Sequence, residues 1–258
     1  MSVIVRSVLF NLLFYLNLVV YLLAAMPTLL LPYRYLLAVA RAWAMTNLWL
    51  LRVICGIKAD FRGLEKMPRG GSIVASKHQS VWETFALLPY VEDPTFILKR
   101  ELMWIPLFGW CLWKAQMIPV NRGARGPALA AMTERAKVEV RRGRQIVIFP
   151  EGTRRPPGAE PQYKFGVAHL YAQTDVPCVP VALNSGLFWP RRSFRRFPGT
   201  VVVQVCDPIA PGLDKSDFIV RLRDVIESAT AKLVEEGQRE LGPYAAEVMA
   251  RAESRARP

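Results

Sequence analysis

At 258 residues, the chain can hold one large domain, or one domain with an appendage. Its 52% hydrophobic and 21% charged residues exclude an intrinsically disordered chain. The 34 basic and 21 acidic residues give a net charge of +13, which suggests an anionic membrane surface at least as readily as nucleic acid. The four cysteines include no CxxC pair, which argues against a zinc ribbon or a disulfide scaffold and favours a reducing compartment.

The N-terminal 57 residues contain four arginines and no acidic residue. Residues 8–31 form an uncharged run that would be about 36 Å long as a helix, enough to cross a bilayer core of ~30 Å. A cleaved signal peptide is the alternative, but the run exceeds the usual ~7–15 apolar residues and no convincing cleavage site follows before Pro32. We therefore expect residues 8–31 to be embedded in a membrane, with a spanning and a re-entrant segment both open.

A second apolar stretch covers residues 35–57, after two prolines that interrupt the helical pattern. Arg34, Arg41 and Arg52 project to nearly one helix face at ~100° per residue. This pattern is typical of an amphipathic helix that lies in the membrane interface, because an arginine at mid-bilayer costs ~2.5–3.5 kcal/mol. A core helix of the soluble part fits the same length and periodicity, so both interpretations stay open.

After residue 57, short β-branched segments alternate with helical patterns, which indicates an α/β fold with a mixed, largely parallel sheet flanked by helices. Strands are expected at residues 71–76, 95–98, 145–149, 178–183 and 201–206, and helices at 127–142 and 214–241. We therefore predict two parts, a membrane-anchoring apolar helical hairpin over residues 1–57 and an α/β domain over 58–258. The alanine- and charge-rich tail after Gly242 is expected to fray.

His78 lies just after the first predicted strand, with Glu83 five positions later. Such a pair suits a general base and its orienting carboxylate. Five residues of a regular helix turn ~500°, so the two side chains can meet only if one of them lies in the loop before the helix. A histidine that caps a helix beside an unrelated glutamate is the structural alternative. His169 has no acidic neighbour in the sequence and is interpreted as structural.

Two further loops carry arginines that could hold a phosphate group. One covers residues 117–123 and contains Arg122; the other covers 149–155 and contains Gly152 and Arg154. Glycine allows a close approach of the backbone to a ligand, and arginine forms forked hydrogen bonds to phosphate oxygens. Each arginine taken singly could equally be a solvated charge.

Three absent motifs narrow the chemistry. The sequence lacks the G-x-S-x-G elbow of α/β-hydrolases, the glycine-rich loops of P-loop and dinucleotide-binding proteins, and the H-E-x-x-H motif of zinc hydrolases.

Four blocks occur in a recognisable order: His-x4-Glu at 78–83, Ile-Pro-Val-Asn-Arg at 118–122, Phe-Pro-Glu-Gly-Thr-Arg at 149–154 and Val-Pro-Val-Ala-Leu-Asn at 179–184. In this order they resemble the glycerolipid acyltransferase family, most of all its bacterial 1-acyl-sn-glycerol-3-phosphate acyltransferases. The resemblance covers about residues 70–210. Glu83 stands where the family most often has aspartate, and Lys77 where asparagine is frequent.

The resemblance implies that the chain transfers an acyl group from acyl-CoA or acyl carrier protein to the sn-2 hydroxyl of lysophosphatidic acid, giving phosphatidic acid. His78 would be the general base and Glu83 its orienting partner. The substrate phosphate would be held by Arg122, Glu151, Gly152, Thr153 and Arg154. No metal or redox cofactor is expected, and membrane lipids, not nucleic acid, are the expected partners. The expected place is the inner membrane, with the catalytic domain on its cytoplasmic face.

Two alternatives to this activity stay open. One is acylation of another lysolipid, such as a lyso-ornithine lipid, and the other is a non-catalytic membrane-binding protein with the same fold. The arginine- and aromatic-rich run at 189–196 could bind anionic lipid or an acidic acyl carrier protein, or could be a solvated basic loop.

Overall fold

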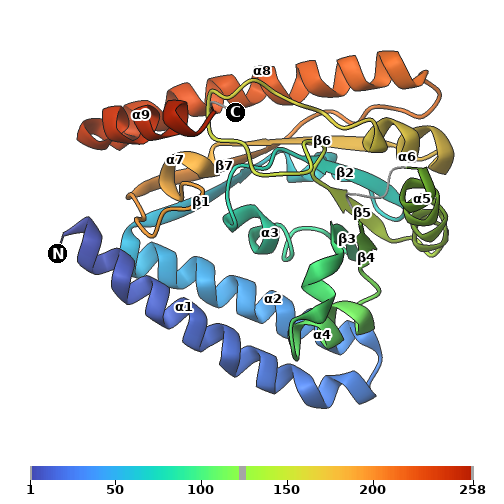
Figure 1. Cartoon of the computed structure of the whole chain (residues 1–258), viewed down its shortest axis with the longest axis horizontal. Coiled ribbons are helices and arrows are strands. Elements are labelled where there is room, and N and C mark those ends of the chain that lie inside the picture. Colours follow the sequence, from blue (N-terminus) through green and yellow to red (C-terminus); the bar gives the residue numbers. More distant parts are fainter. Residues whose placement is uncertain (1, 122–125, 257–258) are drawn as a thin grey trace.

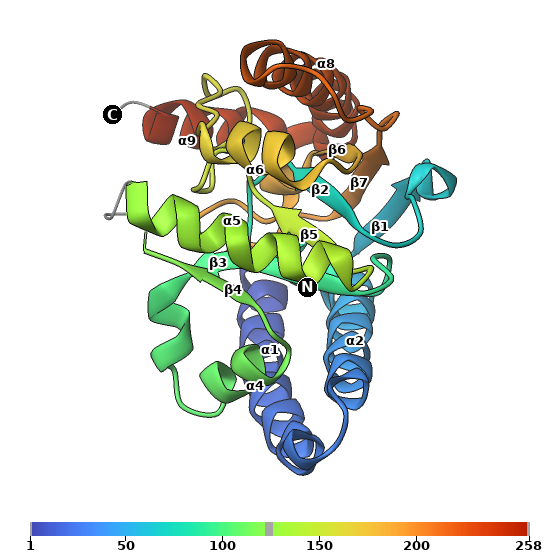
Figure 2. The same cartoon turned by 90° about the vertical axis from the view of Figure 1, so that its right-hand side faces the viewer.

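The computed structural model describes residues 2–121 and 126–256, which form a seven-stranded sheet with helices on both faces (Figures 1 and 2). The strand order is β1-β7-β6-β2-β5-β3-β4, and all neighbouring pairs are parallel except β6 with β7. The strands are β1 (Ile57–Arg62), β2 (Ser72–Ser76), β3 (Pro94–Lys99), β4 (Ile118–Val120), β5 (Gln145–Ile148), β6 (Cys178–Leu183) and β7 (Gly199–Val205). The predicted α/β fold with its largely parallel sheet is confirmed.

The helices of the described chain differ widely in length. They are α1 (Val3–Ala25), α2 (Tyr33–Leu50), α3 (Trp82–Ala86), α4 (Phe108–Lys114), α5 (Gly126–Arg141), α6 (Gly166–Thr174), α7 (Ser185–Phe188), α8 (Lys215–Leu241) and α9 (Ala245–Ala256). Short 3₁₀ turns are η1 (Met26–Leu30), η3 (Leu64–Lys66), η4 (Arg100–Trp104) and η5 (Gly242–Tyr244), and one π-turn is η2 (Leu51–Cys55).

Alternation along the central strands divides the core into two layers, because successive strand side chains point to opposite faces of a sheet. Ile73 and Ile146 pack with α5, α6 and α8. Val74 and Val147 pack with the layer that contains α1, α2, α3 and α4. In Figure 1, α8 accordingly lies above the sheet, and the N-terminal helices lie below it.

The N-terminal hairpin has one face in the core and one face exposed. Both of its segments, Val3–Leu30 and Tyr33–Cys55, are long and apolar enough to cross a membrane. On the inner side, the ring of Phe10 meets Trp189 at 5.4 Å, and Trp43 meets Phe85 of α3 at 5.4 Å between centroids. The hairpin therefore continues the core of the α/β domain beneath α3.

The predicted arginine stripe on the second helix is only partly correct. Arg34 and Arg52 are exposed, but Arg41 turns inward, where its Nε donates to the Leu88 carbonyl at 3.2 Å and its Nη2 to that of Val91 at 2.9 Å. These carbonyls follow α3 and need donors, and a guanidinium on the facing helix supplies them. Each of the two interpretations of α2 is therefore correct for one face: one side packs in the core, and the other is apolar and exposed.

Two further expectations are wrong. Ile118–Val120, expected in a loop, pairs with β3 as the short edge strand β4, which at three residues is too short to show a period-two pattern. The tail after Gly242 does not fray within the described residues. It forms α9, in which Val248 is buried and Arg251 donates to the hydroxyl of Ser193 at 3.2 Å.

Candidate active site

Three loops that carry the candidate residues follow neighbouring strands. β2, β5 and β6 run parallel, with β2 in the middle, so their carboxyl ends meet at one edge of the sheet. His78 follows β2, the 149–155 loop follows β5, and Ser185 follows β6. Ligands of open parallel sheets generally bind in the crevice at this edge.

The structure places His78 and Glu83 in direct contact. His78 Nδ1 lies 2.9 Å from Oε1 of Glu83. Glu83 lies in the first turn of α3, and His78 lies in the loop before that helix, which is the arrangement that their five-residue spacing requires. With Nδ1 bound to the carboxylate, Nε2 is the ring nitrogen left to exchange a proton.

Glu83 is fully buried and receives several hydrogen bonds. Its Oε1 accepts from the backbone N–H of Gln79 at 2.6 Å and of Ser80 at 2.7 Å, and its Oε2 accepts from the hydroxyl of Ser185 at 2.7 Å. Such fixed donors offset the cost of removing a carboxylate from water. The longer side chain of Glu83 is thus held by two backbone amides and by Ser185, the first residue of α7.

The imidazole of His78 is held flat against an aromatic ring. It stacks on Phe149 with 4.1 Å between ring centroids and 21° between planes, and 12% of its side chain is exposed. The carbonyl of His78 accepts from the backbone N–H of Arg155 at 2.8 Å. The loop after β5 therefore supports the histidine at its ring and at its backbone.

The 149–155 loop turns sharply at Gly152, whose φ of +64° lies in the left-handed region that favours glycine. Glu151 does not line the loop's outer side. It is buried, and its Oε1 lies 3.0 Å from Nζ of Lys77. Burial raises the pKa of the Glu151 carboxyl, and the nearby ammonium of Lys77 opposes that rise.

Lys77 extends this ion pair to the long helix α8. Its Nζ also lies 2.7 Å from Oε1 of Glu227, which accepts a hydrogen bond from the Tyr163 hydroxyl at 2.9 Å. Burial, together with the adjacent Glu227, raises the pKa of Tyr163 above its ordinary value, so this hydroxyl remains a donor. The residue before His78 thereby joins the loop after β5 to α8.

The other predicted substrate-binding residues differ in what the structure shows. Thr153 is exposed and Arg154 is half-buried. The Arg154 backbone carbonyl accepts from Nη1 of Arg191 at 2.7 Å, while its guanidinium forms no hydrogen bond or ion pair with the described residues. Arg122 lies outside the described residues.

The run at 189–196 is partly structural. The guanidinium of Arg196 is buried, lies 3.9 Å from the centre of the Trp189 ring, and donates to Asn11 of α1 at 2.9 Å. Burial lowers the pKa of Arg196 to about 10. The interpretation of the whole run as a solvated basic loop is therefore wrong for its two ends, because Trp189 packs against the N-terminal hairpin and Arg196 donates to it.

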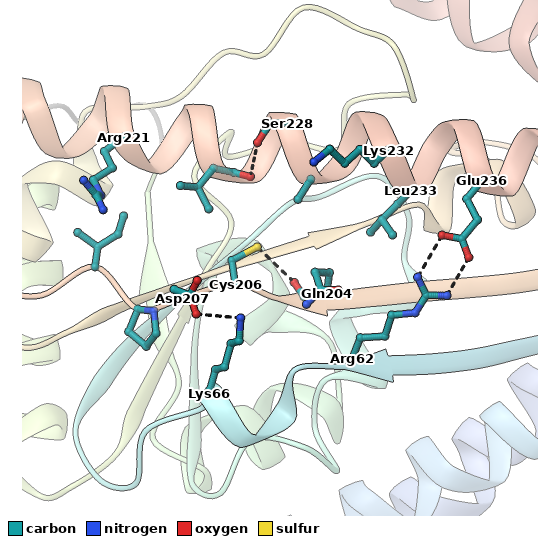
Figure 3. Close-up of a pocket in the computed structure, with 14 residues that line it drawn as sticks. Arg62, Lys66, Gln204, Cys206, Asp207, Arg221, Ser228, Lys232, Leu233 and Glu236 are labelled. Carbon is teal, nitrogen blue, oxygen red and sulfur yellow. Dashed lines mark hydrogen bonds and ion pairs between the residues drawn. The ribbon is translucent and has the colours of Figure 1, made fainter.

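A cleft of about 600 Å³ lies away from these residues, between α8 and the end of the sheet that holds β1 and β7 (Figure 3). Its walls carry the ion pairs Arg62–Glu236 at 2.8 Å and Lys66–Asp207 at 2.8 Å. None of the candidate residues lines it, so the site is identified by its hydrogen-bond geometry and not by this cleft.

Comparison with known proteins agrees with this geometry. The family model described as Acyltransferase matches residues 58–184. Over these residues, about half of its length, the chain is similar to that family. It is 36% identical over 167 residues to a 1-acyl-sn-glycerol-3-phosphate acyltransferase of Pseudomonas aeruginosa, with 65% of each chain covered. It is 29% identical over 189 residues to 1-acyl-sn-glycerol-3-phosphate acyltransferase alpha of Mus musculus, covering 72% of this chain and 66% of the mouse protein.

A solved structure extends the likeness to nearly the whole chain. The crystal structure of the 1-acyl-sn-glycerophosphate (LPA) acyltransferase PlsC from Thermotoga maritima superposes with a TM-score of 0.71 at 25% identity. The match covers 91% of this chain and 97% of that protein. The predicted family resemblance is therefore confirmed, and the chain has the fold of the Thermotoga protein. The chain matches just under two thirds of the lengths of the Pseudomonas and mouse proteins.

Three features of the site were not predicted from the sequence: the role of Ser185, the stacking of Phe149, and the Lys77–Glu227 contact. Phe149 is the last residue of the predicted strand 145–149, and Ser185 lies two positions after the predicted strand 178–183, so their places at strand ends were the available signal. Lys77 and Glu227 are 150 positions apart, and no local pattern links them.

Proposed function

We propose that this acyltransferase moves an acyl group from a thioester to the sn-2 hydroxyl of 1-acyl-glycerol-3-phosphate, giving phosphatidic acid. The observation that carries the proposal is the 2.9 Å contact between His78 and the buried Glu83, beside the loop after β5. The names of the Pseudomonas, mouse and Thermotoga proteins support the choice of acceptor.

In the proposed reaction, Nε2 of His78 takes the proton of the acceptor hydroxyl while Glu83 stabilises the resulting imidazolium. The alkoxide attacks the thioester carbonyl, the C–S bond of the tetrahedral intermediate breaks, and the thiolate leaves with the proton from the imidazolium. Proton transfer of this kind contributes about 10²–10⁴-fold to a rate. The chemistry requires no metal or redox cofactor, and either acyl-CoA or acyl carrier protein can supply the thioester.

The acceptor phosphate is proposed to lie against the 149–155 loop. The Arg154 guanidinium has no partner among the described residues and can form forked hydrogen bonds to phosphate oxygens. The backbone of Gly152 and Thr153 and the side chain of Arg122 complete the proposed phosphate site. Glu151 contributes by bonding to Lys77, which fixes the shape of the loop.

The exposed apolar hairpin supports attachment to a membrane, where the acceptor lipid lies. We propose that this is the inner membrane, with the α/β domain on the cytoplasmic face. Buried or half-buried free cysteines are consistent with that side, because disulfides are uncommon in a reducing compartment.

The test is an acyltransfer assay with the purified full chain in lipid. Acyl-CoA and acyl carrier protein thioesters are each offered with lysophosphatidic acid or with a lyso-ornithine lipid. We expect phosphatidic acid as the product. Transfer to the phosphate-free acceptor, with lysophosphatidic acid ignored, would contradict the phosphate role of Arg122 and Arg154.

Two histidine variants separate chemistry from folding in the same assay. His78→Ala should lower turnover by at least about 10²-fold because it removes the base. His169→Ala is the matched control, since this half-buried histidine lies on α6 with lysines as its charged neighbours. Equal activity of both variants would overturn the general-base role.

A further inference from the structure

Large apolar side chains are exposed around α4, far from the N-terminus in the sequence. The exposed fractions are 71% for Trp104, 45% for Ile105, 58% for Trp110 and 73% for Trp113. Tryptophan is normally among the more buried residues on average, and contiguous exposed apolar patches mark interaction surfaces. Three exposed tryptophans within ten residues therefore need a partner that covers them.

The geometry of α4 gives these side chains a common direction. Trp110 and Trp113 are three positions apart and share one helix face. Cys111 and Leu112 are buried on the opposite face, which packs into the core. The helix is thus fixed by its inner face, and its tryptophans are held outward.

This surface continues the exposed face of the N-terminal hairpin. Helix α4 contacts η1 at the hairpin turn and also contacts α2. Leu30 in that turn is 91% exposed. Figures 1 and 2 both show α4 beside the turn between α1 and α2, on the side of the sheet away from α8.

The charges at the border of the patch are mostly positive. Lys99 and Arg100 are exposed where β3 ends, and Lys114 is half-buried at the end of α4. Glu101 is the single acidic residue between positions 99 and 114. Basic side chains beside tryptophans suit the interface of an anionic bilayer, where tryptophan rings lie at headgroup level and Lys and Arg are attracted to the negative surface.

We propose that residues 99–114 form a membrane wedge, a third apolar element that inserts into the same lipid leaflet as the hairpin. The wedge binds an anionic phospholipid bilayer, with the tryptophans at headgroup depth and the basic residues against lipid phosphates. The inference rests on the proposed membrane attachment and goes beyond it, since it assigns bilayer contact to an internal segment of the α/β domain. Three non-collinear elements would fix the tilt of the domain, and hence the height of His78, relative to the lipid.

Site-specific labels test the wedge in the full chain. In a Cys206→Ser background, where the remaining cysteines are buried, an environment-sensitive fluorophore is attached at Trp113→Cys. Trp49→Cys on the exposed face of α2 is the hairpin control, and Lys232→Cys on α8 is the solvent control. Trp110→Cys provides a second wedge position should the first variant fold poorly. Vesicles contain phosphatidylglycerol and phosphatidylcholine, with or without a spin-labelled or brominated acyl chain.

We expect lipid quenching at position 113 within about twofold of that at position 49, and at least about fivefold above that at position 232, because apolar area is buried in the bilayer. Lipid quenching at 49, with 113 quenched by aqueous iodide alone, would overturn the wedge and leave the attached hairpin intact. Absence of lipid quenching at 49 and 113 alike would overturn both the wedge and the proposed attachment. Protection of 113 from both quenchers, dependent on protein concentration, would assign the patch to a second copy of the chain and overturn the proposal.

A second measurement uses activity on two forms of the acceptor. Trp110→Gln/Trp113→Gln should lower turnover of long-chain lysophosphatidic acid in vesicles by about tenfold, and leave turnover of a monomeric short-chain acceptor unchanged. Val220→Gln is the matched control, an exposed apolar residue on α8. Equal losses on both acceptor forms would contradict a role in membrane contact.

Discussion

Glu83, in the first turn of α3 after β2, and Glu151, in the loop after β5, are both buried, but their charges are stabilised in different ways. Glu83 accepts from two backbone amides and the Ser185 hydroxyl, and it faces an imidazole. Glu151 has the ammonium of Lys77 at 3.0 Å, and its Oε2 has no hydrogen-bond partner among the described residues. Fixed amides stabilise a carboxylate without a permanent counter-charge. Glu83 is therefore suited to stabilising a protonated imidazole, whereas Glu151 is suited to fixing the conformation of the 149–155 loop.

The largest expected effect comes from removing the charge of Glu83 while keeping its shape. In Glu83→Gln, the amide oxygen can still accept from the backbone and from His78, and the NH₂ group can donate to Ser185. The fold should persist, but the imidazolium loses its stabilising charge. We expect turnover to fall by about 10²–10⁴-fold, measured by phosphatidic acid formation.

Glu83→Asp is the matched variant, because it keeps the charge and shortens the reach by one methylene. The carboxylate then loses either His78 or Ser185, and turnover should lie between wild type and Glu83→Gln. Activity of Glu83→Gln equal to wild type would show that the two buried glutamates do not differ in the way proposed.

This contrast marks what the sequence could predict. The contact between His78 and Glu83 follows from local spacing, because a histidine before a helix can meet a glutamate in its first turn. The hydrogen bond from Ser185 to Glu83 depends on β6 lying beside β2. Strand order is a long-range property that cannot be predicted from a local sequence pattern. The overall fold could be predicted because the central strands are strongly apolar. The edge strand β4 could not be predicted, because it has only three residues.

The ion pair of the second loop should be sensitive to removal of one partner. Lys77→Met leaves Glu151 buried without its counter-charge, and such losses cost about 3–5 kcal/mol of unfolding free energy. In Lys77→Met/Glu151→Gln the uncompensated charge is gone, so the double variant should be more stable than Lys77→Met alone. Denaturant unfolding in detergent micelles measures both, and additive losses would show that the two groups do not interact.

The raised pKa of Glu151 also predicts a pH dependence. Burial makes this carboxyl bind its proton more tightly in the folded chain than in the unfolded chain, where the pKa is ~4.3. Its contribution to stability is fully present below that unfolded value and is lost as the pH rises through the folded pKa. Wild type should therefore lose stability relative to Glu151→Gln as the pH rises above ~4.3. A difference that stays constant from acid to neutral pH would contradict this assignment.

The smallest expected effect tests whether Ser185 acts through Glu83. Because Ser185 is fully buried, Ser185→Ala should change KM little. It should lower kcat by about tenfold, because a hydrogen bond to a charged group contributes ~1.5–3 kcal/mol and the two backbone donors to Glu83 remain. Thr230→Ala is the control, because this buried hydroxyl on α8 has no hydrogen-bond partner among the described residues. Equal kcat values for the two variants would mean that the backbone amides alone orient Glu83. A rise in KM with kcat unchanged would instead place Ser185 in substrate binding. The proposed role requires the kcat loss, because a carboxylate held by fewer donors rotates more freely and spends less time aligned with the imidazole.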